Sequence, residues 1–188
     1  MNFDLKKLYK KRSWFDYLLY GLIIVAGILI DQLTKLIATK CLAPENPDSY
    51  AKIVPVIKFG DTNVFSFTYV RNPGAAWGML ENAQWVFLSI STVAIIAMTA
   101  YLFLGHSGSM LEGIGISMLI SGGIGNMFDR LAFGYVVDFL YFELIDFPVF
   151  NGADSFVCVG AGVLILALIL ELIEETKTIK SGKEDSKK

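Results

Sequence analysis

The feature that most constrains the fold of this chain is a set of four apolar segments, each long enough to cross a bilayer as a helix. A helix needs about 20 residues to span roughly 30 Å of hydrocarbon. The segments that meet this length are 15–37, 85–104, 110–128 and 155–173. Composition agrees, since 54% of the 188 residues are hydrophobic and the mean hydropathy is +0.55. We therefore expect an integral membrane protein.

The third apolar segment differs from the others because it is rich in glycine. Its run GIGISMLISGGIG places small residues at intervals of two to four. Small residues allow neighbouring helices to approach closely inside a membrane. We therefore expect 110–128 to be the central helix of the bundle.

Basic residues cluster at the two ends of the chain, and they predict its orientation. With four spans both ends share a side, which the positive-inside rule makes cytoplasmic. We expect one membrane domain over 1–188, with cytoplasmic tails 1–14 and 176–188 and with 40–84 and 129–154 facing outward. The basic residues are Lys6, Lys7, Lys10, Lys11 and Arg12 before the first span, and Lys177, Lys180, Lys183, Lys187 and Lys188 after the last.

The first outward segment contains two stretches with strand character, KIVPVIKF and NVFSFTYV, separated by Gly-Asp-Thr. In the second, Phe65, Phe67 and Tyr69 alternate with Ser66 and Thr68, which is the period of a half-buried strand. The predicted fold is an all-α transmembrane bundle of four helices with a small extracytoplasmic antiparallel sheet at about 50–71. The sheet could be a platform for an extended peptide or a packed cap without a ligand.

Polar residues in the first span and after the sheet are candidates for a site. Asp31 and Lys35 lie four residues apart on one helical face, where they can pair while Lys35 extends outward. This pair either positions the helix or takes part in chemistry, and the spacing slightly favours positioning. In RNPGAAWGM, Asn72 precedes a turn that contains Gly74, and its side chain could either bind substrate or cap the turn. The small alanines at 75–76 leave room for another backbone to approach closely.

The end of the third span, GGIGNMFDR, places Asn126, Asp129 and Arg130 on one helical face. An arginine beside an aspartate keeps that carboxylate charged. We expect Asp129 and Arg130 to form an orienting ion pair and not to supply a catalytic base.

Asp138 in VVDF and Asp154 in FNGADS have no cation near them in sequence. Asp138 lies among apolar residues, so desolvation should raise its pKa. Asp154 lies at the expected start of the fourth helix, where the helix dipole stabilises negative charge. Unequal environments suit an acid and a base that work together. Either residue alone fits a structural role, whereas the two together favour a catalytic pair.

These motifs, in this order, resemble the lipoprotein signal peptidases (signal peptidase II), aspartic endopeptidases of the bacterial cytoplasmic membrane. The matching motifs are DQLTK, RNPGAAWG, GGIGNMFDR, VVDF and FNGADS. The resemblance implies that Asp138 and Asp154 are the catalytic dyad. It also implies that a further set of residues supports the dyad or the substrate: Asp31, Lys35, Asn72, Gly74, Asn126, Asp129, Arg130, Asn151 and Ala153.

The resemblance further implies the reaction and the partners. The substrate is a prolipoprotein carrying a diacylglyceryl group, and cleavage falls on the amino side of the modified cysteine. We expect membrane lipid as a partner, a monomer, a site towards the outer face of the inner membrane, and neither cofactor nor metal. A net charge of −2 does not suit nucleic acid, and the lone His106 excludes a multi-histidine metal site. A small transporter or a scaffold protein remains the alternative.

Overall fold

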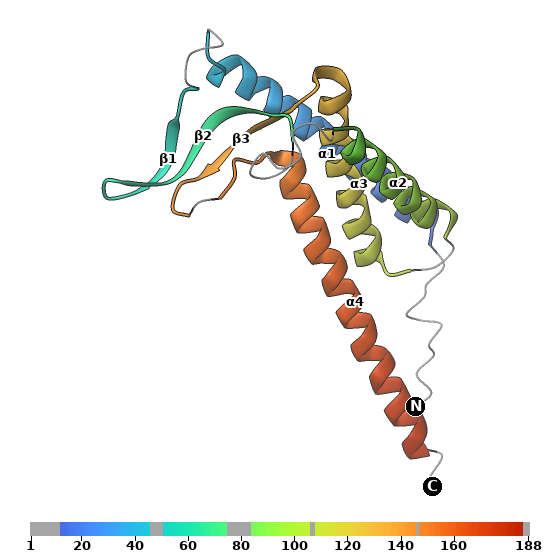
Figure 1. Ribbon diagram of the computed structural model, residues 1–188. Helices are drawn as coiled ribbons and strands as arrows, with labels where there is room; N and C mark the ends of the chain where they lie inside the picture. Colours follow the sequence, from blue (N-terminus) through green and yellow to red (C-terminus); the bar gives the residue numbers. More distant parts are fainter. Residues whose placement is uncertain (1–11, 46–50, 75–83, 106–107, 146, 186–188) are drawn as a thin grey trace.

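The computed structural model describes residues 12–45, 51–74, 84–105, 108–145 and 147–185. Within these ranges the chain forms four helices and three strands, and Figure 1 shows the small sheet beside one end of the helical bundle. In chain order the elements are α1 (Trp14–Leu42), β1 (Val54–Phe59), β2 (Thr62–Asn72), α2 (Gln84–Leu104), α3 (Met110–Phe133), β3 (Val136–Phe142) and α4 (Gly152–Asp185). All four helices are long and apolar enough to cross a membrane. This is the bundle with an antiparallel sheet that the sequence predicts.

The helices extend beyond the predicted spans at the end of the molecule that carries the sheet. α1 continues past residue 37 to Leu42, α3 continues past residue 128 to Phe133, and α4 begins at Gly152 instead of residue 155. These extra turns contain charged or polar residues, which hydropathy excludes from a span although they are helical. Gly134, with φ 80°, then ends α3 and turns the chain directly into β3.

α3 is the central helix, as its small residues predict, because it packs against α1, α2 and α4. Half of its most apolar stretch is buried. A Cβ added to Gly115 would lie 2.9 Å from the carbonyl oxygen of Gly160, and one added to Gly122 would lie 2.3 Å from that of Ala153. Glycine at these positions therefore allows α3 and α4 to touch backbone to backbone.

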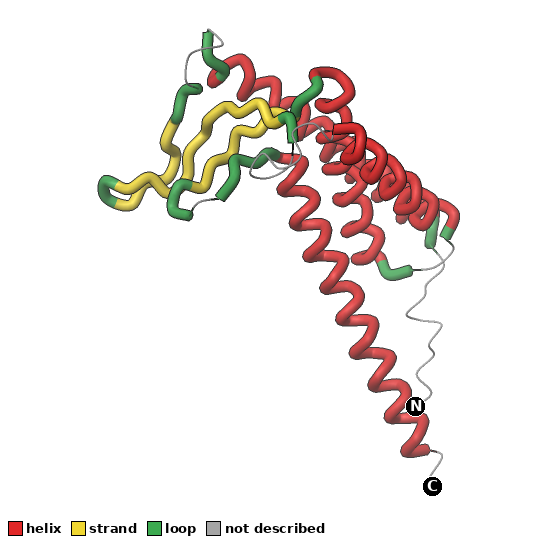
Figure 2. The backbone as a smooth tube through the Cα atoms, viewed as in Figure 1, coloured by secondary structure: helices red, strands yellow, loops and turns green. Residues whose placement is uncertain are grey.

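The sheet has three antiparallel strands in the order β1-β2-β3 (Figure 2). The sequence predicts β1 and β2 but not β3, whose seven residues VVDFLYF show no polar alternation. The expected alternation in β2 holds from Phe65 to Thr68, but the polar Ser66 and Thr68 are buried while Phe65 and Phe67 are only partly so. It fails at Tyr69, which is buried next to Thr68, where the pairing with β3 shifts register. The buried hydroxyl of Ser66 is satisfied because it donates to Glu143, which follows β3.

A short stretch before α4 joins the edge of β3. The backbone N–H of Leu140 donates to the carbonyl oxygen of Phe150 at 2.8 Å, and the N–H of Phe150 donates back at 3.0 Å. The start of α4 is thereby fixed beside the strand that carries Asp138. This connection brings two segments that hydropathy treats as separate into one site.

Candidate active site

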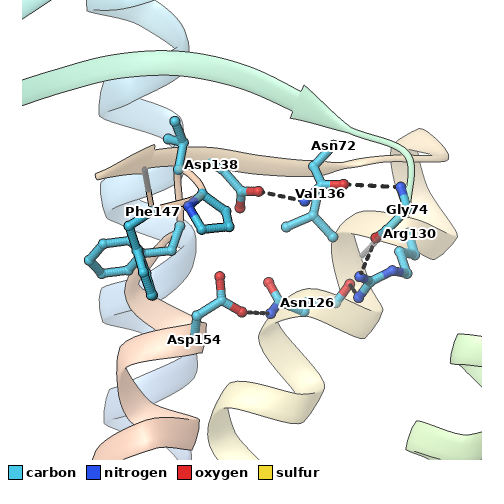
Figure 3. Close-up of a pocket in the computed structure, with 11 residues that line it drawn as sticks. Asn72, Gly74, Asn126, Arg130, Val136, Asp138, Phe147 and Asp154 are labelled. Atoms are coloured by element: carbon cyan, nitrogen blue, oxygen red, sulfur yellow. Dashed lines mark hydrogen bonds between the residues drawn. The ribbon is translucent and has the colours of Figure 1, made fainter. Parts of the chain in front are cut away.

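A pocket of about 370 Å³ opens where β3, α3 and the start of α4 meet. Figure 3 shows Asp138 on the strand and Asp154 on the helix, both facing this pocket. Its lining residues are Asn72, Gly74, Asn126, Arg130, Val136, Asp138, Phe147, Pro148, Val149, Phe150 and Asp154. The pocket therefore combines two carboxyl groups with an apolar wall at 147–150.

Asp138 is buried, with 2% of its surface exposed, and both of its carboxyl oxygens are hydrogen-bonded. Oδ1 accepts from Asn151 Nδ2 at 2.7 Å, and Oδ2 accepts from Asn72 Nδ2 at 2.8 Å. The pKa of Asp138 is raised to about 7, mainly by burial; the nearby charge of Asp154 contributes to the rise, whereas the hydrogen bonds from Asn72 and Asn151 oppose it. The expected effect of desolvation on Asp138 is confirmed.

Asp154 lies in the first turn of α4, where the sequence places it. Its Oδ2 accepts from the backbone N–H of Asn151 at 3.2 Å, and its own N–H donates to Asn151 Oδ1 at 3.0 Å. These reciprocal bonds resemble a capping box. The other oxygen, Oδ1, accepts from Asn126 Nδ2 at 2.7 Å. The carboxyl group is thus held in one orientation towards the pocket.

Lys35 lies behind the two carboxyl groups with all three of its ammonium protons used. Nζ lies 2.8 Å from Asp31 Oδ2 and 3.0 Å from Asp129 Oδ2, and it donates to Asn126 Oδ1 at 3.0 Å. The expected Asp31–Lys35 pair is confirmed. The expectation that Lys35 extends outward is wrong, since the residue is 3% exposed and two buried carboxylates hold it inside.

Asn126 links Lys35 to both carboxyl groups of the pocket. Its Oδ1 accepts from Lys35 and from Asn151 Nδ2, which fixes the side-chain amide so that its Nδ2 points at Asp154. Asn151 in turn donates to Asp138. An uninterrupted network therefore runs from the buried lysine to Asp138 and Asp154.

Asp31 and Asp129 connect this network to the backbone on either side. Asp31 Oδ1 accepts from the N–H of Ala153 at 2.8 Å, and Asp129 Oδ2 accepts from the N–H of Val137 at 3.1 Å. Each backbone amide belongs to the residue directly before Asp154 or Asp138. The two buried aspartates thus fix the positions of the two pocket carboxyl groups along the chain.

The expected ion pair between Asp129 and Arg130 is wrong. Asp129 pairs with Lys35, because neighbours on a helix point in different directions and only Asp129 faces α1. Arg130 instead donates to the carbonyl oxygens of Gly74 at 3.2 Å and Asn126 at 3.4 Å (Figure 3). Since Gly74 N–H donates to Asn72 Oδ1 at 3.0 Å, Arg130 holds the turn that directs Asn72 to its carboxylate.

One residue of the network was missed by the sequence reasoning. Gln32 Nε2 lies 3.1 Å from Asp31 Oδ2 and 2.9 Å from Asp129 Oδ1, so it bridges the two aspartates beside Lys35. Its signal was present, since Gln32 is an uncharged polar residue inside an apolar span next to Asp31.

The structure brings all the predicted site residues into one connected cluster. The network includes Asp31, Lys35, Asn72, Gly74, Asn126, Asp129, Arg130, Asp138, Asn151, Ala153 and Asp154. The predictions about the alanines at 75–76 and about His106 lie outside the described residues.

The fold and the pocket together define a multi-pass membrane protein with two carboxyl groups facing one cavity, an arrangement that suits aspartic peptidase chemistry. The chain belongs to the signal peptidase II family, whose model, described as "Signal peptidase (SPase) II", matches residues 23–170. It is therefore a peptidase of the signal peptidase II type, and the resemblance drawn from the sequence is confirmed.

Individual relatives agree with this assignment. The lipoprotein signal peptidase of Clostridium tetani is 42% identical over 153 residues, which cover 80% of this chain and 92% of the relative. That of Lactiplantibacillus plantarum is 38% identical over 155 residues, with the same coverage of 80% and 92%. A solved bacterial membrane enzyme superposes with a TM-score of 0.72 at 30% identity, covering 87% of this chain and 93% of that one.

Proposed function

We propose that this chain removes the signal peptide from diacylglyceryl-modified prolipoproteins, cutting on the amino side of the modified cysteine. The relatives named above are lipoprotein signal peptidases. The single observation that carries the mechanism is that Asp138 and Asp154 face one pocket with every carboxyl oxygen held by an N–H donor.

The proposed reaction uses one proton shared by the two carboxyl groups. In this proposal Asp138, whose pKa is raised to about 7 mainly by burial, carries that proton and acts as the acid, and Asp154 acts as the base. Asp154 takes a proton from a water that attacks the scissile carbonyl carbon, and Asp138 gives its proton to the carbonyl oxygen. When the tetrahedral intermediate collapses, the C–N bond breaks and the leaving amine takes the proton from Asp154. Asp138 takes back the proton of one hydroxyl as the C=O bond of the product acid forms.

The supporting residues act in this proposal as positioning residues. Asn72 and Asn151 orient Asp138, and Asn126 orients Asp154. The buried cluster of Lys35 with its two aspartates holds that arrangement from behind. A lipid-anchored substrate would enter sideways from the bilayer. This suits the position of β3 and the start of α4, which carry the two carboxyl groups of the pocket, at one end of the bundle (Figure 1).

We further propose that both termini are cytoplasmic and that the pocket opens towards the outer face of the bacterial inner membrane. The lysines at the two ends of the chain support this orientation. In this proposal the enzyme acts as a monomer in contact with membrane lipid.

The experiment is cleavage by the purified chain of two matched precursors, one carrying the diacylglyceryl group on its cysteine and one without it. Mass analysis should show products cut directly before the modified cysteine, with the unmodified precursor intact and EDTA without effect. Failure to cut either precursor would overturn the proposal. Activity lost to EDTA and restored by zinc would overturn the two-carboxylate mechanism.

A transporter or a scaffold protein predicts different results. Purified chain in liposomes that moved ions and cut no precursor would support a transporter. A double Asp138→Asn, Asp154→Asn variant that kept full function in cells would support a scaffold.

A further inference from the structure

A second hollow, of about 480 Å³, lies on the side of β3 away from the active-site pocket. Its walls come from one face of α1, the end of α3 and the start of β3. The lining residues are Leu29, Gln32, Leu33, Lys35, Leu36, Thr39, Asp129, Phe133, Tyr135 and Val137. We call this hollow the α1 groove.

The alternation of side chains along β3 separates the two cavities. Val136 and Asp138 line the active-site pocket, whereas Tyr135 and Val137 line the α1 groove. The groove meets the network behind the active site at three side chains, which are the buried Lys35 and Asp129 and the half-buried Gln32 between α1 and α3. It is therefore a separate site, open on the other side of the strand.

The lining of the α1 groove changes from apolar at one end to more polar at the other, as a membrane lipid does from its acyl chains to its headgroup. Leu29 and Leu33 line its end farther from the sheet and are more than half exposed, so in a bilayer they are open to an acyl chain. Thr39 and Tyr135 line it nearer the sheet. Leu29 and Thr39 are about 15 Å apart along the helix, which is about half the thickness of the hydrocarbon core and hence the reach of one acyl chain.

The positively charged side chain of Arg71 lies at the end of the α1 groove that is nearer the sheet. Arg71 pairs in register with Val137, on the same face of the sheet as the groove. Its guanidinium carbon lies 5.3 Å from the centre of the Tyr135 ring and 5.9 Å from that of Tyr69, and Nε donates to Tyr69 Oη at 3.3 Å. The two rings hold the charge beside the groove while the side chain stays exposed.

Arg71 has no acidic partner in the part of the chain that the structure describes. Among the described residues, no carboxylate lies within 4.0 Å of its guanidinium. The acidic residue that lines the groove, Asp129, is 1% exposed and already paired with Lys35. A guanidinium held at the end of an apolar groove is complementary to a phospholipid, because the guanidinium can bind the phosphate while the groove holds an acyl chain.

We propose that the α1 groove binds an anionic glycerophospholipid of the membrane, with one acyl chain along Leu29, Leu33 and Leu36 and its phosphate on Arg71. The diacylglyceryl group of the proposed substrate has no phosphate, so it is not the occupant. The bound lipid packs α1 against β3 directly behind Lys35 and Asp129. The inference is independent of the proposed cleavage reaction, because binding requires no precursor.

The test is native mass spectrometry of the detergent-purified chain supplied with dioleoylphosphatidylglycerol or with dioleoylglycerol. We expect the phospholipid to be retained more tightly than the diacylglycerol. Arg71→Gln should weaken phospholipid binding roughly fivefold, which is the effect of one basic side chain at an anionic lipid. Lys58→Gln is the matched control, since it removes an exposed cation on β1 away from the groove, and it should not change binding.

A second pair of variants tests the apolar part. Leu33→Trp fills the groove and should remove the bound lipid, whereas Leu22→Trp, on an equally exposed part of α1, should keep it. Equal retention of phospholipid and diacylglycerol would overturn the proposal. So would equal weakening by Arg71→Gln and Lys58→Gln, or undiminished binding in Leu33→Trp. None of these readings depends on whether the chain cuts a precursor.

Discussion

Replacing Asp138 by asparagine should change how the stability of the protein depends on pH. The folded protein holds a proton on Asp138 up to about pH 7, whereas the unfolded chain releases it near its usual pKa of 3.8. Between these values the folded state binds more protons, so the free energy of unfolding falls as pH rises. The stabilising contribution is complete at low pH and is lost as pH passes through about 7.

The size of this effect follows from the two pKa values. Moving from 3.8 to about 7 corresponds to about 4 kcal/mol, at 1.36 kcal/mol for each pH unit. The asparagine of Asp138→Asn does not titrate. The hydrogen bonds that it loses or gains with Asn72 and Asn151 change the free energy of unfolding by an amount that does not depend on pH. The difference in unfolding free energy between wild type and variant should therefore change by about 4 kcal/mol between pH 4 and pH 8, in favour of the variant at high pH.

Denaturant-induced unfolding in detergent micelles at a series of pH values measures this difference. Asp61→Asn is the matched control, because it removes an exposed carboxyl group in the turn between β1 and β2, and its difference from wild type should change much less. A difference between wild type and Asp138→Asn that stayed constant from pH 4 to pH 8 would refute the reasoning that burial holds a proton on this residue.

Three further predictions concern the same site. Lys35→Met leaves two buried carboxylates unpaired and should cost about 3–5 kcal/mol of unfolding free energy, whereas the exposed Lys40→Met should cost less than about 0.5 kcal/mol. Gly122→Ala puts a Cβ 2.3 Å from a carbonyl oxygen of α4 and should lower the free energy of unfolding by about 1–3 kcal/mol. Gly21→Ala, which has open space around it, should not lower it. Similar melting temperatures of the two variants would contradict the packing argument. Precursor cleavage should fall about tenfold per pH unit above pH 7 as Asp138 loses its proton; a flat profile up to pH 9 would oppose this.

The membrane-spanning part of the fold is predictable from the sequence because a bilayer imposes one length and one composition on every span. The central position of α3 is also predictable, because small residues such as Gly115 and Gly122 allow the backbone of a neighbouring helix to approach closely. β3 is not predictable in the same way. Its run VVDFLYF is apolar on both faces because one face lines a pocket and the other packs towards α1, so it lacks the alternation of β2.

The membership of the site was predictable, but its pairing was not. Asp31 and Lys35 are four residues apart on one helix, and their contact follows from helical geometry alone. The partner of Asp129 depends on how α1 and α3 pack. Its position next to Arg130 in the sequence therefore predicted the wrong ion pair, since Asp129 pairs with Lys35 of α1. The hydrogen bonds from Asp31 and Asp129 to the amides of Ala153 and Val137 require tertiary structure and leave no pattern in the sequence.

The most direct test of the proposed mechanism is the cleavage rate of a diacylglyceryl-modified precursor by Asp138→Asn and Asp154→Asn, each measured separately. Each variant should be about 10²- to 10⁴-fold slower than wild type, which is the range for loss of a general acid or base. Asp61→Asn should cut at the wild-type rate, and all three variants should unfold cooperatively. A wild-type rate in either Asp138→Asn or Asp154→Asn would contradict the assignment of these two residues as the catalytic pair.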